Sequence, residues 1–130
     1  MRLRGELSLT KLYEFTDNRK RGKPIVWLGN TLVSVQHFPS DIRDLVGKQL
    51  RLVQCGELPT DWKPMSTIGP GTVELRVHLS GEYRVIYVSK FPEAIYILNA
   101  FLKKTEKTPR LEIIRARRAY AEIKHKQDQD

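Results

Sequence analysis

The chain has 130 residues, of which 40% are apolar, and its 23 Lys and Arg residues stand against 15 Asp and Glu, for a formal net charge of +8. This composition suits one small folded domain, and it excludes a multidomain enzyme, a collagen-like repeat and a disulfide scaffold, since Cys55 is the single cysteine. The N-terminal residues lack the apolar stretch of a secretory signal, and the most apolar run, Ala94 to Leu102, is far shorter than the roughly 20 residues of a membrane-spanning helix. We therefore expect a cytoplasmic protein.

The basic surplus lies at the two ends of the chain. Residues 1–24 and 103–130 each carry a net charge of +4, whereas residues 25–102 hold 7 basic and 7 acidic side chains. Basic segments beside a neutral body suit a protein that binds a polyanion or an acidic partner, and they suit simple solubility equally well. We expect an N-terminal basic arm over 1–23, a folded domain over 24–124 and a C-terminal tail over 125–130.

The first predicted elements are a strand and two helices. Residues 25–28 form a β-branched and aromatic run stopped by Gly29, typical of a buried first strand, and a short helix is expected over 31–37. A longer helix is predicted from Ser40, the expected cap, to Gly56, because apolar residues recur at helical spacing between them. Residues 57–71 hold three of the seven prolines, which predicts a loop.

The second half of the chain predicts three antiparallel strands and a last helix. Apolar and polar residues alternate over 73–79, Ser80-Gly81 marks a hairpin, and strands are expected over 83–88 and 94–102, the last apolar on both faces as in a central strand. Thr108-Pro109 opens the final helix, which is expected to fray from Lys126 onward and to cover the sheet with an apolar stripe of Ile113, Ala116, Tyr120 and Ile123. The fold class is therefore α+β, an antiparallel sheet backed by helices.

Common catalytic motifs are missing from the sequence. His37, His78 and His125 have no cysteine or carboxylate at metal-ligand spacing, and no phosphate-binding glycine loop precedes a helix. We expect neither a metal nor a cofactor.

The hairpin gathers the remaining candidates. With a three-residue loop over 80–82, His78 stands opposite Arg84, and both share a face with Arg76, so that three basic groups converge as in a phosphate site. With a two-residue loop, Val77 faces Arg84 and the cluster breaks. Alternatively the face is a solvated strand surface on which Glu74 and Glu82 neutralise the arginines. Trp62 either stacks on a base or, as is commoner for a lone loop tryptophan, plugs the core.

Several motifs, taken in their order and spacing over residues 24–124, resemble the phage-derived, HigB-like branch of the RelE/ParE toxin superfamily. The motifs are Pro24-Ile25-Val26-Trp27-Leu28-Gly29, Phe38-Pro39, Gln54-x-Gly56-x-x-Pro59-x-Asp61-Trp62-Lys63-Pro64-Met65, Gly69-x-Gly71, Glu74-Leu75-Arg76, Tyr83-Arg84-Val85-Ile86-Tyr87-Val88-x-Lys90-Phe91 and Phe101-x-Lys103-Lys104-x-x-Lys107-Thr108-Pro109. The resemblance implies a compact fold like that of microbial ribonucleases.

The resemblance also implies an activity and partners. The activity is metal-independent cleavage of mRNA, commonly on the translating ribosome, by attack of the RNA's own 2′-hydroxyl on the adjacent phosphate, and a cognate helix-turn-helix antitoxin neutralises it. Arg84 matches the family's phosphate-binding arginine, Arg76 a neighbouring basic position, and Lys104 the basic group after the last strand; His78 is our candidate general acid or base because its ordinary pKa is near neutral. Further RNA contacts are expected from the basic residues Lys103, Lys63, Lys107 and Arg110.

Two other functions fit the same fold. ParE-like relatives act on DNA gyrase, and a non-enzymatic module would only bind an antitoxin-like repressor.

Overall fold

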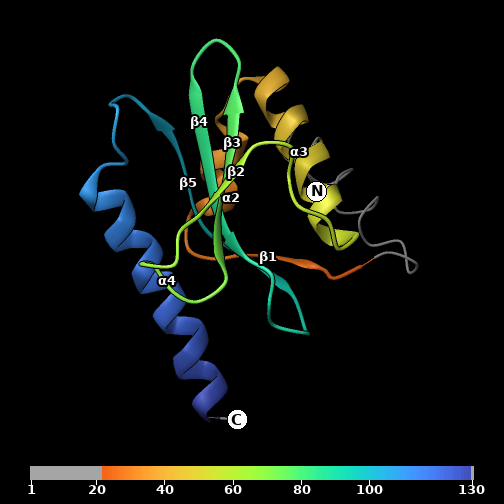
Figure 1. The fold of residues 1–130 in the computed structure, drawn as a ribbon, viewed down its shortest axis with the longest axis vertical. Coiled ribbons are helices and arrows are strands. Elements are labelled where there is room, and N and C mark those ends of the chain that lie inside the picture. The colour runs from red at the N-terminus through yellow and green to blue at the C-terminus, as the bar shows by residue number, and fades with distance from the viewer. Residues whose placement is uncertain (1–21, 130) are drawn as a thin grey trace.

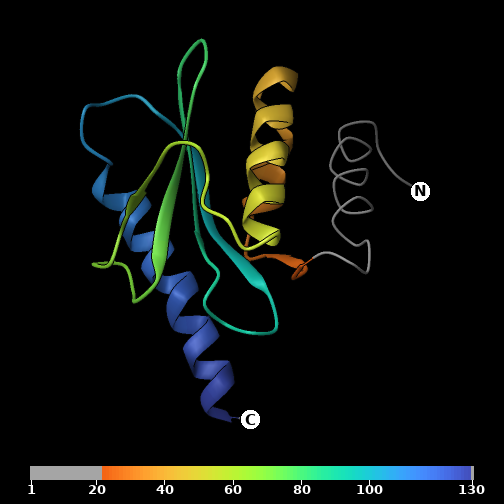
Figure 2. The same ribbon diagram turned by 45° about the vertical axis from the view of Figure 1, so that its right-hand side comes forward.

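The structure is a computed structural model that describes residues 22–129. It consists of one five-stranded mixed sheet with helices on both faces (Figures 1 and 2). This arrangement confirms the predicted α+β class and the sheet backed by helices, but the sheet is mixed rather than antiparallel throughout, because its first strand pairs in parallel with its last. The predicted arm over residues 1–23 lies outside the described residues apart from its last two, Gly22 and Lys23.

The strands do not follow the sheet in chain order. The elements are β1 (Ile25–Trp27), α2 (Thr31–Gln36), α3 (Ser40–Gln54), β2 (Trp62–Pro64), β3 (Thr72–His78), β4 (Glu82–Val88), β5 (Ile95–Lys103) and α4 (Arg110–Gln129). The sheet order is β1-β5-β4-β3-β2, with β1 parallel to β5 and the other neighbours antiparallel. The predicted central position of the last strand is confirmed, because β5 has a neighbour on each side.

Each face of the sheet carries its own apolar core. One core joins α2 and α3 to inward residues such as Leu75, Val85 and Ile97, and the other joins α4 to Ile86, Val88 and Leu98 (Figure 2). The predicted α4 stripe supplies the second core, since Ala116, Tyr120 and Ile123 are buried and Ile113 packs against them. Alternation along β3 and β4 therefore sends odd-numbered residues to α3 and even-numbered residues to α4.

Four sequence expectations about local structure are wrong. Ser40 is not a cap: α3 begins at Ser40 itself, Pro39 occupies the cap position, and no side chain caps the helix. The first strand, β1, is an edge strand rather than a buried one, and its Val26 is exposed. The loop over 57–71 contains the short strand β2, whose Pro64 needs no hydrogen-bonding N–H because β2 is an edge strand. Trp62 lies in β2 and is 38% exposed, so it does not plug the core.

Helix α4 extends further than the predicted fraying point. It continues to Gln129, and its C-terminal half is joined to the turn before β5: the side chain of Gln127 donates to Glu93 Oε2 (2.6 Å), which also accepts from the Tyr96 hydroxyl (2.7 Å). This anchor explains why the helix stays regular past Lys126. Within residues 22–129 no helix is long and apolar enough to cross a membrane.

Candidate functional site

The hairpin between β3 and β4 sets the register of the candidate residues. The loop is Leu79–Gly81, so Arg76 pairs with Arg84 and His78 pairs with Glu82. The predicted pairing of His78 with Arg84 is therefore wrong, and so is the two-residue alternative. Positive φ angles at Ser80 (53°) and Gly81 (145°) complete the reversal one residue earlier than expected. The prediction that the three residues share one face is confirmed, because the observed register still places Arg76, His78 and Arg84 on the α4 side of the sheet.

These residues belong to a larger group on that face, which we call the polar cluster. Its members are Asp61, Glu74, Arg76, His78, Glu82 and Arg84. Asp61 joins from the residue before β2, because the pairing of β2 with β3 brings it beside Arg76, whose backbone N–H donates to the Asp61 carbonyl (3.0 Å).

Arg84 lies at the centre of the polar cluster and is 3% exposed. Its Nη2 lies 3.1 Å from Glu82 Oε1, its Nε lies 3.7 Å from Glu74 Oε1, and its Nη1 donates to the carbonyl of Tyr83 (3.1 Å). A guanidinium in the sheet interior needs such counter-charges because an unpaired buried charge is very costly. The alternative in which Glu74 and Glu82 neutralise the arginine thus describes Arg84 correctly, except that Arg84 is buried rather than solvated.

Arg76 is the more accessible arginine, with 31% of its side chain exposed. Its Nε lies 3.6 Å from Glu74 Oε1 and its Nη1 lies 3.9 Å from Asp61 Oδ1. Glu74 therefore lies between the two guanidinium groups, and its second oxygen accepts from the Thr108 hydroxyl (3.2 Å), just before α4.

Both arginines keep an unused donor. The Nε atoms of Arg76 and Arg84 are buried and have no hydrogen-bond partner, since both lie beyond hydrogen-bonding distance of Glu74. A buried donor without a partner costs about 1–3 kcal/mol. Such donors are rare in folded proteins, and a catalytic role is one of their recognised explanations.

His78 stands between two carboxylates. Its Nδ1 lies 2.6 Å from Glu82 Oε1, and its Nε2 is hydrogen-bonded to Asp61 Oδ2. Because both ring nitrogens face carboxylate oxygens, the arrangement fits the doubly protonated ring, which donates from each nitrogen. The two carboxylates lie on opposite sides of the ring, and within residues 22–129 no group of His, Cys, Asp and Glu could hold a metal ion.

The pKa of the Glu82 carboxyl reflects its contacts with Arg84 and His78. Desolvation acts to raise the pKa of the Glu82 carboxyl, but the hydrogen bonds and positive charges of Arg84 and His78 outweigh it and hold that pKa below its ordinary value. The ionised carboxylate is therefore the form that the polar cluster favours.

The predicted lysines lie around the polar cluster rather than in it. Lys103 is the β5 partner of Glu82, and its Nζ donates to the carbonyl of Glu106 (2.5 Å), whereas Lys104 is exposed just beyond the strand. Lys63 is exposed opposite Glu74 on β2. Lys107 and Arg110 are exposed in the connection to α4 and at the start of α4.

Sequence reasoning missed Asp61 as a partner of this face. Glu74 and Glu82 could be placed there by alternation, but Asp61 arrives only through the pairing of β2 with β3, in a segment that reads as a proline-rich loop. No local sequence signal would have identified it.

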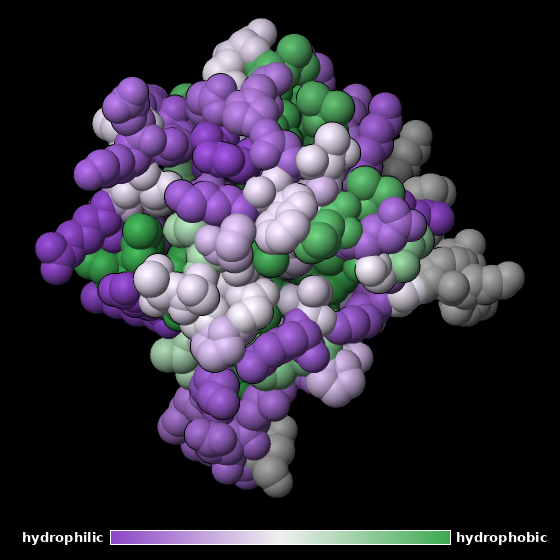
Figure 3. Space-filling model, viewed as in Figure 1, coloured by the Kyte–Doolittle hydropathy of each residue, from purple (hydrophilic) through white to green (hydrophobic). Residues whose placement is uncertain are grey.

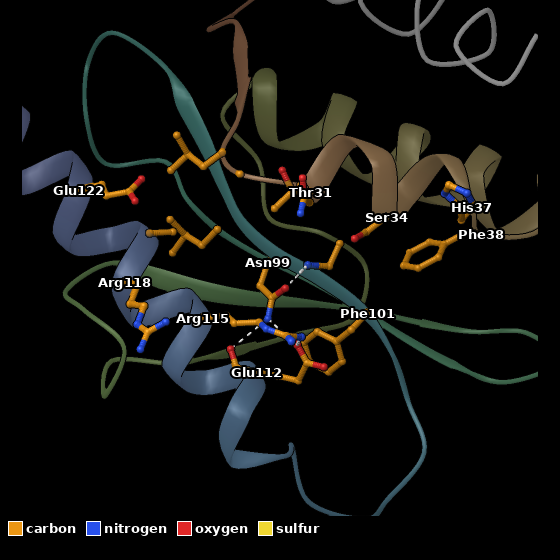
Figure 4. A pocket seen from close by; sticks show the side chains of 16 residues that line it. Thr31, Ser34, His37, Phe38, Asn99, Phe101, Glu112, Arg115, Arg118 and Glu122 are labelled. Carbon is orange, nitrogen blue, oxygen red and sulfur yellow. Dashed lines mark hydrogen bonds and ion pairs between the residues drawn. The ribbon is translucent and has the colours of Figure 1, made fainter. Parts of the chain in front are cut away.

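A cavity of about 680 Å³ lies beside β5 and is lined by residues outside the polar cluster (Figure 4). It lies between α2 and α4 along the edge of β5 that β1 leaves uncovered, because β1 pairs only with residues 95–97. Phe101, which lines it, is the β5 neighbour of Arg84. Asn99 fixes its wall: its side-chain amide donates to the carbonyl and the carboxylate of Glu112 (2.9 Å each), and its Oδ1 accepts from the N–H of Ala100 (2.9 Å).

Comparison with known proteins gives one match. Residues 34–121, more than half of the chain, match the model of the family described as phage derived protein Gp49-like (DUF891). No curated protein and no solved structure matches the chain. The matched residues include α3, all of β2 to β5 and the first half of α4, and hence the whole polar cluster.

Proposed function

Because the chain belongs to the Gp49-like family of phage-derived proteins, and because it resembles HigB-like toxins in sequence, we propose that it is the toxin of a type II toxin-antitoxin pair and a metal-independent endoribonuclease. Its substrate is mRNA, bound on the ribosome, and its inhibitor is a helix-turn-helix antitoxin. The observation that carries the proposal is the polar cluster, in which two arginines with unused donors lie beside a histidine held by two carboxylates.

The reaction needs groups that the polar cluster contains. The RNA 2′-oxygen attacks the adjacent phosphorus, the bond from phosphorus to the 5′-oxygen breaks, and the products end in a 2′,3′-cyclic phosphate and a 5′-hydroxyl. His78 donates the proton to the leaving 5′-oxygen after one of its two hydrogen bonds, to Asp61 or to Glu82, opens, and the released carboxylate is the nearest base for the proton of the 2′-hydroxyl. Arg76, the accessible arginine, binds the phosphate as negative charge develops on it.

Arg84 and the lysines have supporting roles in this proposal. Arg84 is paired with Glu74 and Glu82, so it positions Glu82 against His78 and reaches a phosphate only if those ion pairs open. Lys104 follows the end of β5, Lys103, Lys107 and Arg110 lie at the same end of the sheet, and Lys63 lies on β2 beside Glu74; in this proposal they bind the RNA backbone.

The test is primer extension on cellular mRNA after brief expression of the protein, together with the growth curve. We expect growth arrest and new 5′ ends, and we expect His78→Gln to lower the cleavage rate by about 100-fold or more. Arg76→Gln should lower the cleavage rate as well. Because Arg76 is partly exposed, this change should destabilise the fold less than a change of the buried Arg84. The matched controls are His125→Gln and Lys48→Gln, which change exposed residues on other surfaces. Unchanged cleavage in both cluster variants would rule out this site.

One observation favours a second function, a non-enzymatic module that binds a partner protein. The polar cluster holds three carboxylates against two guanidinium groups and the ring of His78, so its cations are already paired and no excess positive charge is left to attract a phosphate. Such a module would cause no growth arrest and leave mRNA intact. Arrest with intact mRNA and loss of supercoiling would instead indicate a gyrase-directed toxin.

A further inference from the structure

The cavity between α2 and α4 contains features that the polar cluster does not explain. Its lining includes the hydroxyls of Thr31 and Ser34, the rings of Phe38 and Phe101, and Arg118 (Figure 4). At about 680 Å³ it has the size of ordinary small-molecule sites.

Thr31 is the first sign of an absent ligand. The residue is only 5% exposed, yet its hydroxyl has no hydrogen-bond partner. A methyl group in place of that hydroxyl would fit the buried site without cost, since it would leave no polar atom unpaired. Thr31 lines the cavity, and its buried hydroxyl becomes available to a ligand as a donor and acceptor when the side chain turns toward the cavity.

Arg118 is the second sign. It lines the cavity from α4 and has no ion pair or hydrogen bond among the described residues, whereas Arg115, one turn earlier, lies 3.4 Å from Glu112. Arg115 and Arg118 are three residues apart, so they lie on the same side of α4, and both line the cavity.

The opposite wall offers polar and aromatic groups. His37 Nδ1 lies 2.8 Å from the carbonyl of Val33 and must be the donor there, so a neutral ring keeps Nε2 as an acceptor. On the α4 side, one turn after Arg118, the carboxylate of Glu122 also lines the cavity and can accept a hydrogen bond from a base amino group. Two arginines, two carboxylates (Glu112, which pairs with Arg115, and Glu122), hydroxyls and aromatic rings line the cavity, and together they match the parts of a nucleotide.

We propose that this cavity binds a nucleoside monophosphate unit, with the phosphate on Arg118 and Arg115 and the ribose or base on Thr31. The unit comes either from a single-stranded RNA or from a free nucleotide. The RNA source rests on the proposed function: Phe101 lies between the cavity and Arg84 in the register of β4 and β5, so a strand bound in the cavity continues toward the polar cluster.

The test is a titration of the isotope-labelled full chain followed by amide chemical shifts. The probes are adenosine monophosphate, inorganic phosphate and a short single-stranded RNA with 2′-O-methyl groups, which cannot be cleaved by 2′-hydroxyl attack. We expect adenosine monophosphate to shift the amides of Thr31, Ala100 and Arg118. Inorganic phosphate should bind at least about tenfold more weakly, a difference of about 1.4 kcal/mol.

Variants distinguish specific binding in the cavity from non-specific attraction of an anionic probe to a protein of net charge +8. Arg118→Gln and Thr31→Val should each raise the dissociation constant, the first by about tenfold and the second by about threefold, in keeping with one charged and one neutral hydrogen bond. Lys124→Gln removes the same charge from a part of α4 that does not line the cavity, and it should change the dissociation constant by less than about twofold. Thr31→Val should fold at least as stably as the wild type, so its loss of binding cannot be blamed on unfolding.

Each outcome has one meaning. Shifts with the RNA alone, with adenosine monophosphate alone or with both support the site and identify the source of the nucleotide. No shift at the cavity with any probe, equal binding of phosphate and adenosine monophosphate, or equal binding by Arg118→Gln and Lys124→Gln overturns it. If the protein cleaves mRNA but binds nothing in the cavity, the proposed function stands and this inference is wrong. If the cavity binds the nucleotide but the protein does not cleave mRNA, this inference stands and the proposed function is wrong.

Discussion

Arg84 has a structural role that a simple activity test would confuse with a catalytic one. It is buried with Glu74, and removing one partner of a buried ion pair leaves the other charge unpaired. We expect Arg84→Met to lower the free energy of unfolding by about 3 kcal/mol, measured by urea denaturation. Loss of toxicity in such a variant would therefore say nothing about phosphate binding.

The double variant Arg84→Met/Glu74→Leu tests whether Arg84 stabilises the fold through its ion pair with Glu74, because it removes both charges of that pair. The loss of stability in the double variant should be clearly smaller than the sum of the losses in the two single variants, since the unpaired charge is gone. If the losses simply add, Arg84 and Glu74 are not coupled, and the ion pair across β3 and β4 does not hold Arg84 in place.

Glu82 gives the polar cluster an acid-sensitive component. Its pKa is lowered in the folded chain, so the fold favours the ionised form; the resulting stability is present above the ordinary pKa of 4.5 and is lost as the pH falls through the lower folded value. We expect the melting temperature of the wild type to exceed that of Glu82→Gln at pH 7, and the difference to shrink as the pH falls below about 4.5. Thermal melts of both proteins between pH 7 and pH 3 measure it. A difference in melting temperature that does not change with pH would contradict the lowered pKa of Glu82 in the folded chain.

At the scale of elements, the sequence predicts best what is periodic. Alternation over β3, the doubly apolar β5 and the stripe on α4 were all predictable, because burial on one face or both leaves a regular pattern. The same alternation placed Arg76, His78 and Arg84 on one face. The partner of each residue was not predictable, since it depends on a loop that shifts by one residue when Ser80 and Gly81 adopt positive φ.

Long-range pairing accounts for the rest of what the sequence could not predict. Strand β2 holds only three residues, includes Pro64, and is a strand only because β3 offers it an open edge. Asp61 and the exposed position of Trp62 follow from that pairing. The cavity likewise depends on β1 ending at Trp27, which leaves the edge of β5 uncovered, and on the position of α2 beside it.

The docking of α4 depends on a close approach at Gly69. A Cβ at this position would meet the ring of Tyr120 at 2.6 Å, and the Tyr120 hydroxyl donates to the neighbouring carbonyl of Pro70 (2.8 Å). The ring cannot move without losing this bond, so we expect Gly69→Ala to destabilise the fold by about 1–3 kcal/mol. Ser66→Ala, an exposed change in the same loop, is the matched control in thermal melts. Equal melting temperatures for the two variants would show that α4 tolerates a shift here.

At the scale of the whole molecule, the hairpin, the end of β5 and the connection to α4 lie at one end of the sheet (Figure 1). The surface over that connection and over the C-terminal half of α4 is strongly hydrophilic (Figure 3). Residues 103–110, which lie at this end, hold the basic residues Lys103, Lys104, Lys107 and Arg110 against Glu106 alone, a net charge of 4 − 1 = +3. A basic segment at the polar-cluster end suits contact with an RNA backbone, whereas basic residues spread over the surface would serve solubility alone.

The salt dependence of RNA binding separates these two readings. Each phosphate contact on a single strand contributes about −0.7 to the slope of log K against log salt concentration, so replacing Lys104, Lys107 and Arg110 together by Gln should make the slope shallower by about 2. The control replaces Lys48, Lys124 and Lys126 by Gln, which removes the same net charge from α3 and from the distant half of α4. Binding of a non-cleavable single-stranded RNA at several salt concentrations measures both slopes. If the two variants lose the same slope, net charge alone attracts the RNA, and the end of the sheet that carries the polar cluster is not where the strand lies.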